Sequence, residues 1–250
     1  MSDKWYELSF GADYVARYSR RDGAEARRAV QAVAPQMAFA GGTVLDLCCG
    51  AGRHIGPLLD AGAAHVIGVD LSAPLLAVAG MQLGDEVTAG RVRLIRADMR
   101  ELPLAAASLD AALSFFSSFG YFDDEADDRR VMAGVARALR PGGTYALDFF
   151  NAPVAVRALV AEDRTEVDGE VLLQQREYDT ATRRINKLVR GEDGRVVAEE
   201  SVRAWHPAEL VAMAGSVGLR VFNTLGDYRG TPFDASTSER FIGLFRRHDG

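Results

Sequence analysis

Residues 40–150 alternate short apolar runs with longer amphipathic segments, and this alternation constrains the fold more than any other feature of the sequence. Short apolar runs bounded by turn residues are typical of strands in a parallel sheet, and the segments between them are typical of helices that cover it. The sequence therefore predicts an α/β domain. Its expected strands span residues 43–48, 65–70, 92–97, 109–115 and 144–149, with helices at about 53–62, 73–84 and 124–139.

The flanking segments follow other patterns. Upstream, residues 22–35 predict an amphipathic helix, and aromatic residues precede it, so we expect a cap over the sheet. Downstream, three alternating runs separated by turn residues predict an antiparallel β insertion before the last helix. The expected order along a single domain of residues 1–250 is a cap at 1–36, a core at 40–150, the insertion at 164–205, and a final helix with two strands at 206–247.

Composition limits the classes of function. Basic residues number 29 and acidic residues 35, and the resulting net charge of −6 disfavours nucleic-acid binding driven by positive charge. No stretch approaches the roughly eighteen apolar residues of a membrane span, so no membrane association is expected. The adjacent Cys48 and Cys49 cannot form a disulfide framework and lack the spaced partners of a zinc site. We therefore expect a cytoplasmic protein without a bound metal.

A glycine turn follows the first expected strand. Glycine lets the backbone pass close to a ligand, and the free amides of the next helix favour an anionic group. Gly50 and Gly52 alone are weak evidence, but Asp70 ends the next strand, where a carboxylate can accept hydrogen bonds from both ribose hydroxyls. Asp98 ends the third strand and can accept from an adenine amino group, with Met99 packing on the ring. Together these residues predict a nucleoside pocket at the carboxyl edge of the sheet.

Five motifs carry a family resemblance: VLDLCCGAGRH, VIGVDLS, RADMRELP, SLDAALSFFSSFGYF and ALRPGGTYALDFF. In order and spacing they resemble the motifs of class I S-adenosylmethionine-dependent methyltransferases, and the flanks look like a bacterial small-molecule branch of that family. The resemblance implies S-adenosylmethionine as cofactor and a doubly wound, Rossmann-like sheet of seven strands in the order 3-2-1-4-5-7-6, with the last strand antiparallel. It also implies a cofactor site made of Tyr14, Arg21, Asp46, Gly50, Ala51, Gly52, Asp70, Leu71, Asp98, Met99 and Ser114.

A dinucleotide-binding enzyme is the competing interpretation of the glycine turn. The fingerprint Gly-x-Gly-x-x-Gly needs a third glycine, but the next one, Gly56, comes one residue too late. The Arg-Pro-Gly-Gly segment before the fifth strand is not part of the dinucleotide pattern, and no lysine follows a tyrosine at the spacing of a short-chain reductase. These departures favour the methyltransferase interpretation.

The acceptor is expected beside residues 114–122, after the fourth strand. This segment lacks the Asn/Asp-Pro-Pro-Tyr/Phe signature of enzymes that methylate amino groups of nucleic-acid bases or glutamine, which favours a small organic acceptor. The aromatic residues after the fourth strand either pack in the core or wall the pocket; Phe119 and Tyr121 are the better candidates for the wall, because Gly120 between them indicates a loop. Tyr14 and His206 are the candidate catalytic bases for an acceptor that must lose a proton, although His206 is also explained as the start of a helix.

Tyr14, Tyr18 and Arg21 resemble a segment that folds over the cofactor in related enzymes, where Arg21 would pair with the cofactor carboxylate. Two other functions stay open: binding of the cofactor or its demethylated product without catalysis, and methylation of a protein or RNA, which the acidic charge disfavours. The insertion is expected either to roof the pocket or to pair with a second subunit, so the protein is a monomer or a homodimer.

Overall fold

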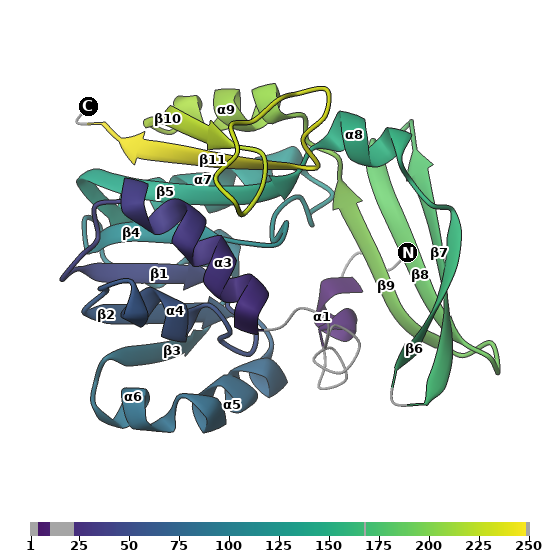
Figure 1. Cartoon of the computed structure of the whole chain (residues 1–250), viewed down its shortest axis with the longest axis horizontal. Coiled ribbons are helices and arrows are strands. Elements are labelled where there is room, and N and C mark those ends of the chain that lie inside the picture. Colours follow the sequence, from purple (N-terminus) through teal and green to yellow (C-terminus); the bar gives the residue numbers. More distant parts are fainter. Residues whose placement is uncertain (1–4, 11–22, 168, 249–250) are drawn as a thin grey trace.

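The computed structural model describes residues 5–10, 23–167 and 169–248. Seven strands form its main sheet, in the order β3-β2-β1-β4-β5-β11-β10 (Figure 1). Neighbouring strands from β1 to β5 are parallel, whereas β11 is antiparallel to both β5 and β10. The bounds are β1 Thr43–Leu47, β2 His65–Asp70, β3 Val92–Arg96, β4 Leu109–Ser114, β5 Leu139–Phe150, β10 Leu219–Leu225 and β11 Arg240–Arg247.

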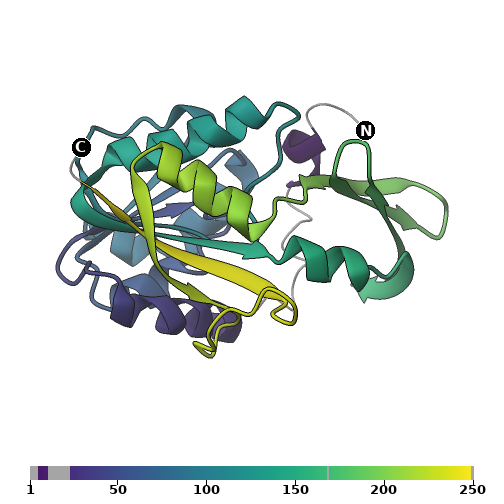
Figure 2. The same cartoon turned by 90° about the horizontal axis from the view of Figure 1, so that it is seen from above.

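Helices cover both faces of this sheet (Figure 2), because the strands are apolar on both sides. One core contains residues of α7 and α9, and the other contains residues of α3 and α4. The helix bounds are α1 Trp5–Ser9, α3 Gly23–Val33, α4 Ile55–Asp60, α5 Ala73–Gln82, α6 Gly84–Thr88, α7 Glu125–Ala138, α8 Ala152–Arg157 and α9 Pro207–Ser216, with short 3-10 helices η1 Ala34–Gln36 and η2 Met99–Glu101.

A second, antiparallel sheet stands beside the first (Figure 1). Its strands lie in the order β6-β7-β8-β9, with bounds β6 Glu162–Val167, β7 Glu170–Asp179, β8 Arg184–Gly191 and β9 Val196–Arg203. The sequence predicted three alternating runs here, and the structure adds β6 as a fourth strand. Most residues of β6 are charged and it lies at the edge of the sheet, where charges hinder pairing with another chain.

The short helix α1 packs on the second sheet. The Ser9 hydroxyl donates to the carbonyl oxygen of Glu199 in β9 at 2.5 Å, and the Glu199 amide donates back to the same hydroxyl at 3.0 Å. This contact brings the start of the described chain beside a strand 190 residues further along the sequence.

The predicted fold class and strand order are confirmed. The helix α9 and the strand β10 lie in the range 206–247 that was predicted for a final helix and two strands. The strand β5 begins five residues earlier than expected, at Leu139 rather than Thr144. Within the described part of the chain, no helix is both long and apolar enough to cross a membrane.

Candidate functional site

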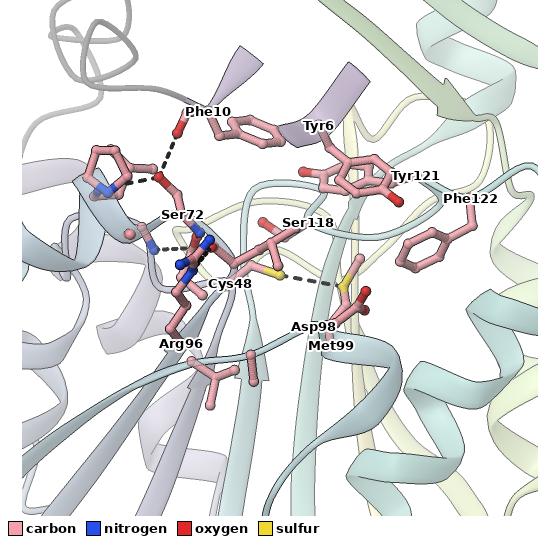
Figure 3. Close-up of a pocket in the computed structure, with 18 residues that line it drawn as sticks. Tyr6, Phe10, Cys48, Ser72, Arg96, Asp98, Met99, Ser118, Tyr121 and Phe122 are labelled. Atoms are coloured by element: carbon pink, nitrogen blue, oxygen red, sulfur yellow. Dashed lines mark hydrogen bonds between the residues drawn. The ribbon is translucent and has the colours of Figure 1, made fainter. Parts of the chain in front are cut away.

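A cavity of about 400 Å³ lies at the carboxyl ends of β1, β2, β3 and β4, and this volume is in the range of small-molecule sites (Figure 3). It adjoins the place where the strand order reverses, between β1 and β4, which is where open α/β sheets bind ligands. Its walls come from the turns after these strands and from the N-terminal segment. The lining residues are Tyr6, Phe10, Cys48, Gly50, Val69, Asp70, Leu71, Ser72, Ala73, Pro74, Leu75, Arg96, Ala97, Asp98, Met99, Ser118, Tyr121 and Phe122.

The glycine turn after β1 uses its two glycines differently. Gly50 has a φ of +55° and lines the cavity, and a Cβ atom placed there would meet only Leu75, another lining residue, at 3.8 Å. Gly52 has a φ of +79°, but its Cβ would come within 2.9 Å of the Leu83 side chain and 3.2 Å of Ala79. Neither Gly52 nor Ala51 lines the cavity. Gly50 therefore leaves space on the cavity side. Gly52 allows close packing against α5 and against Leu83, which follows this helix.

The same turn contains a strained cysteine. Cys48 has a φ of +60°, a left-handed conformation that favours glycine. Its thiol lies 3.5 Å from the Met99 sulfur at the cavity wall (Figure 3). Burial, aided by the negative charges of Asp70 and Asp46, raises the pKa of this thiol well above its usual value, so it stays protonated at neutral pH. The sequence analysis considered Cys48 only as a disulfide or zinc ligand and did not place it in the pocket.

Asp70 joins the first two turns. Its Oδ2 accepts from the Gly50 amide and its Oδ1 from the Ser72 amide, both at 2.8 Å. Burial raises the pKa of Asp70, and these backbone hydrogen bonds oppose the rise. Each carboxylate oxygen keeps a further lone pair, so Asp70 can accept additional hydrogen bonds from a ligand in the cavity. Leu71 follows it and lines the same wall.

Asp98 lines the cavity and is paired with Arg100. Its Oδ1 accepts from the Arg100 amide at 2.9 Å, and its Oδ2 accepts from the guanidinium at 2.6 Å. Burial alone would raise the pKa of Asp98, but the hydrogen bonds and charge of Arg100 lower it. Arg100 also binds Asp127 at 2.9 Å and lies over the Phe122 ring, 4.4 Å from its centroid. Asp98 and Met99 were predicted from the sequence to contact the ligand, whereas the pairing of Asp98 with Arg100 was not predicted.

Besides Ala51 and Gly52, two further predicted cofactor residues do not line the cavity. Ser114 is fully buried, and its hydroxyl accepts from Tyr145 at 3.0 Å. Asp46 is 1% exposed, and its Oδ2 has no hydrogen-bond partner among the described residues. The nearest histidine nitrogen, Nδ1 of His54, is 4.0 Å away. Burial raises the pKa of Asp46 to about 7, although Arg53 lowers it and Asp70 raises it further.

Of the two candidate bases, only His206 belongs to the described residues. His206 is exposed at the first turn of α9, where its amide donates to the Glu209 carboxylate at 2.8 Å, and it does not line the cavity. Tyr14 and Arg21 lie outside the described residues, as does Tyr18. The structure thus gives His206 the helix-start position that the sequence also allowed.

An aromatic wall closes one side of the cavity; we use this name for Trp5, Tyr6, Phe10, Tyr121 and Phe122. The Tyr121 ring centroid lies 5.1 Å from that of Trp5 and 5.8 Å from that of Phe10, while the Tyr6 and Phe122 centroids are 5.7 Å apart (Figure 3). All of these residues except Trp5 line the cavity. The expectation for Tyr121 therefore agrees with its position.

Phe119, the other residue expected in the wall, does not line the cavity. It is fully buried and packs edge-on against Phe149, with ring centroids 6.5 Å apart. The expectation for Phe119 was therefore wrong, because its ring points into the core beneath the loop.

Comparisons with known proteins agree with this architecture. Residues 44–143 match the family described as "Methyltransferase domain". The chain is 29% identical over 214 residues to cypemycin N-terminal methyltransferase from a Streptomyces species, an alignment that covers 83% of this chain and 84% of that one. It is 32% identical over 107 residues to the O-methyltransferase rstn1 of Aspergillus nomiae, which covers 43% of this chain and 46% of that one.

A solved structure has the same fold over the whole chain. The CcbJ methyltransferase from Streptomyces caelestis superimposes with a TM-score of 0.81 and 24% identity, covering 100% of both chains. The matched domain, the relatives and the sheet order agree with the five sequence motifs. Residues 44–143 therefore match a methyltransferase domain, and the chain as a whole has the Rossmann-like fold of the S-adenosylmethionine-dependent methyltransferases to which it is similar.

Proposed function

We propose that the protein transfers a methyl group from S-adenosylmethionine to the nitrogen of a small-molecule amine, with the cofactor bound in the cavity beside Asp70. One observation carries the placement of the cofactor. The Asp70 carboxylate lines the cavity, is oriented by two backbone amides, and keeps lone pairs that suit the two hydroxyls of a ribose. The volume of about 400 Å³ also suits a ligand of this size.

In this proposal the described lining residues divide between the cofactor and the acceptor, with Tyr121 and Phe122 beside the acceptor. Asp98 accepts from the adenine amino group, and Met99 and Leu71 contact the adenine ring. Gly50 lets the backbone approach the ligand. Asp46, Ala51, Gly52 and Ser114 do not line the cavity, so we assign them to support of the turn and of the strand ends rather than to direct contact. The roles of Tyr14 and Arg21 remain predictions.

When bound, S-adenosylmethionine supplies a methyl group that leaves its sulfonium as the acceptor's lone pair attacks. The chain's own contribution is to hold the two reactants in line, which can lower a barrier by about 7 to 11 kcal/mol. The aromatic wall keeps water away from the reacting atoms. A neutral amine needs no base before it attacks, which is consistent with a lining that includes neither histidine nor lysine among the described residues.

The choice of nitrogen over oxygen rests on how far each likeness extends. The likeness to the fungal O-methyltransferase spans 43% of this chain, whereas the likeness to the Streptomyces N-terminal methyltransferase spans 83% of it. The longer likeness therefore includes regions outside the shared domain, to which we assign the choice of acceptor. The proposal also places the activity in a bacterial cytoplasm, supported by that Streptomyces relative and by two cysteines without a disulfide.

The test is a turnover assay with a panel of small amines and matched alcohols. Methylated product and S-adenosylhomocysteine would be measured by mass spectrometry, and light scattering would give the monomer or dimer state. We expect methylated amines and no methylated alcohols. Methylated alcohols alone would contradict the nitrogen assignment. Tight binding of S-adenosylhomocysteine without any turnover across the panel would favour the binding protein that lacks catalysis.

A further inference from the structure

The loop between β4 and α7, residues 115–124, forms part of the cavity wall without regular secondary structure of its own. Ser118, Tyr121 and Phe122 line the cavity from this loop. Its backbone also contains residues in left-handed conformations, with φ of +60° at Phe116 and +58° at Ser117. Such conformations cost free energy and persist only when neighbouring structure imposes them. The contacts that hold this loop therefore decide the shape of the wall.

Arg184, the first residue of β8, supplies several of these contacts from the second sheet. The side chain is buried, with 6% of the residue exposed, and it donates to the carbonyl oxygens of Phe122 at 2.8 Å, Tyr121 at 2.9 Å and Gly120 at 3.4 Å. Its remaining bonds go to Ser201 in β9, from Nε to Oγ and from Nη2 to the carbonyl oxygen, both at 2.7 Å. A guanidinium carries its N–H donors in one plane, and all three nitrogens of this side chain donate hydrogen bonds.

The other bonds from outside the loop reach residues that do not line the cavity. Asp148 accepts from the Phe116 amide at 2.8 Å, and the Arg203 guanidinium donates to the Asp123 carbonyl oxygen at 2.6 Å. The Arg203 amide donates to the Gly120 carbonyl at 2.8 Å, and the Gly120 amide donates to Asp128 Oδ1 at 3.2 Å. Asp128 is itself held by the indole N–H of Trp205 at 2.8 Å. Arg184 extends the attachment from Gly120 to the next two residues, whose side chains line the cavity.

The second sheet also supports the side chains of the aromatic wall, through α1. Ser9 of α1 is bonded to Glu199 in β9, so α1 sits on the same strand that carries Ser201. Trp5 at the start of α1 then contacts the Tyr121 ring at 5.1 Å between centroids. Arg184 fixes the backbone of Tyr121 while α1 packs against its ring, and both are anchored in the second sheet.

We propose that Arg184 is a positioning residue of the methyl-transfer site, which couples the second sheet to Tyr121 and Phe122 and so sets the space for the acceptor. Arg184 does not line the cavity and acts only through the loop. The inference rests on the proposed function, because it assigns these two side chains to the acceptor. Gly50 and Asp70 are bonded to each other, so the loss of Arg184 should leave the proposed ribose contact in place.

The test compares three variants. Arg184→Met removes every donor, and Arg184→Lys keeps a charge with fewer donors. Arg183→Met is the matched control: it removes the neighbouring arginine, which forms an ion pair with Glu209 at 2.6 Å and does not line the cavity. Hydrogen exchange of residues 117–124 is measured by mass spectrometry, S-adenosylhomocysteine affinity by calorimetry, and KM and kcat with an amine from the panel.

In Arg184→Met we expect hydrogen exchange in the loop to be about tenfold faster or more, because removing buried hydrogen bonds destabilises the closed loop. We expect acceptor KM to rise by a similar factor, with S-adenosylhomocysteine affinity within about threefold of the native value, which is well under 1 kcal/mol. Arg184→Lys should lie between native and Met, and Arg183→Met should match native.

Unchanged loop exchange in Arg184→Met, or an equal change in Arg183→Met, would overturn the proposal. So would an affinity for S-adenosylhomocysteine that falls as much as acceptor KM rises. If Arg184→Met does not fold, Arg184→Lys is judged by the same criteria. If the native protein binds no S-adenosylhomocysteine, the proposed function fails, while the exchange measurement still decides whether Arg184 holds the loop.

Discussion

Replacing Asp46 by asparagine should remove much of the pH dependence of the protein's stability. Asp46 is 1% exposed, and its Oδ2 has no hydrogen-bond partner among the described residues. Its neighbour His54 cannot supply a compensating charge, because burial lowers the pKa of that imidazole well below its usual value. Burial raises the pKa of Asp46 from 3.8 to about 7, with Arg53 opposing the rise and Asp70 adding to it.

The magnitude follows from this shift of roughly three pH units. Each unit corresponds to about 1.4 kcal/mol, so keeping Asp46 ionised in the folded protein costs about 4 kcal/mol. Because the folded-state pKa is raised, the folded protein binds this proton more tightly than the unfolded chain does. The stabilising contribution is therefore complete below about pH 4 and is lost as the pH rises through about 7. Asparagine cannot ionise and has no such loss.

The assay is urea unfolding followed by circular dichroism at about pH 4, 6 and 8 and constant salt. Between the lowest and highest pH, the unfolding free energy of Asp46→Asn should improve relative to native by up to about 4 kcal/mol. Asp60→Asn, at an exposed carboxylate, is the control and should stay parallel to native. Parallel curves for native and Asp46→Asn would refute the reasoning, since they would mean that Asp46 titrates alike in the folded and unfolded chains.

Three further outcomes are expected. Cys48→Gly should be more stable to urea than Cys48→Ala by about 1 kcal/mol, because only glycine relieves the left-handed strain; the opposite order would mean that no strain is stored there. Asp70→Asn should weaken S-adenosylhomocysteine binding by about tenfold or more in calorimetry, and equal affinity would argue against the ribose contact. Gly52→Val should lower the unfolding free energy by about 1 to 3 kcal/mol through its clash with Leu83, whereas a neutral result would show that α5 shifts freely.

Local sequence signals predicted the elements that depend on local contacts. The strands β1 to β4 end within one residue of their predicted limits, since each is an apolar run closed by turn residues. The strand β6, with the sequence EDRTEV, was missed because an exposed edge strand needs no apolar alternation. The strand order came from the family resemblance rather than from the residues themselves.

The site residues also divide into those that local sequence signals predict and those that they do not. Gly50, Asp70 and Asp98 reach the cavity because they lie at or shortly after the carboxyl ends of strands that meet at one edge of the sheet. Ser114 also ends a strand, but its side chain is buried against Tyr145, and sequence alone does not show which way such a side chain turns. The bonds of Arg184 join residues 62 to 64 positions apart, in segments with no shared periodicity, so no local pattern indicates them.

The attachment of the loop through main-chain oxygens bears on how easily this enzyme can be redesigned. Every amino acid has a main-chain carbonyl group, so a substitution at position 121 or 122 keeps the oxygen that accepts the hydrogen bond from Arg184. The identity of these two side chains is thus independent of the hydrogen bonds that hold their backbone. Saturation libraries at these positions should therefore retain folded members. Natural divergence has the same freedom to exchange one substrate for another while the scaffold stays constant.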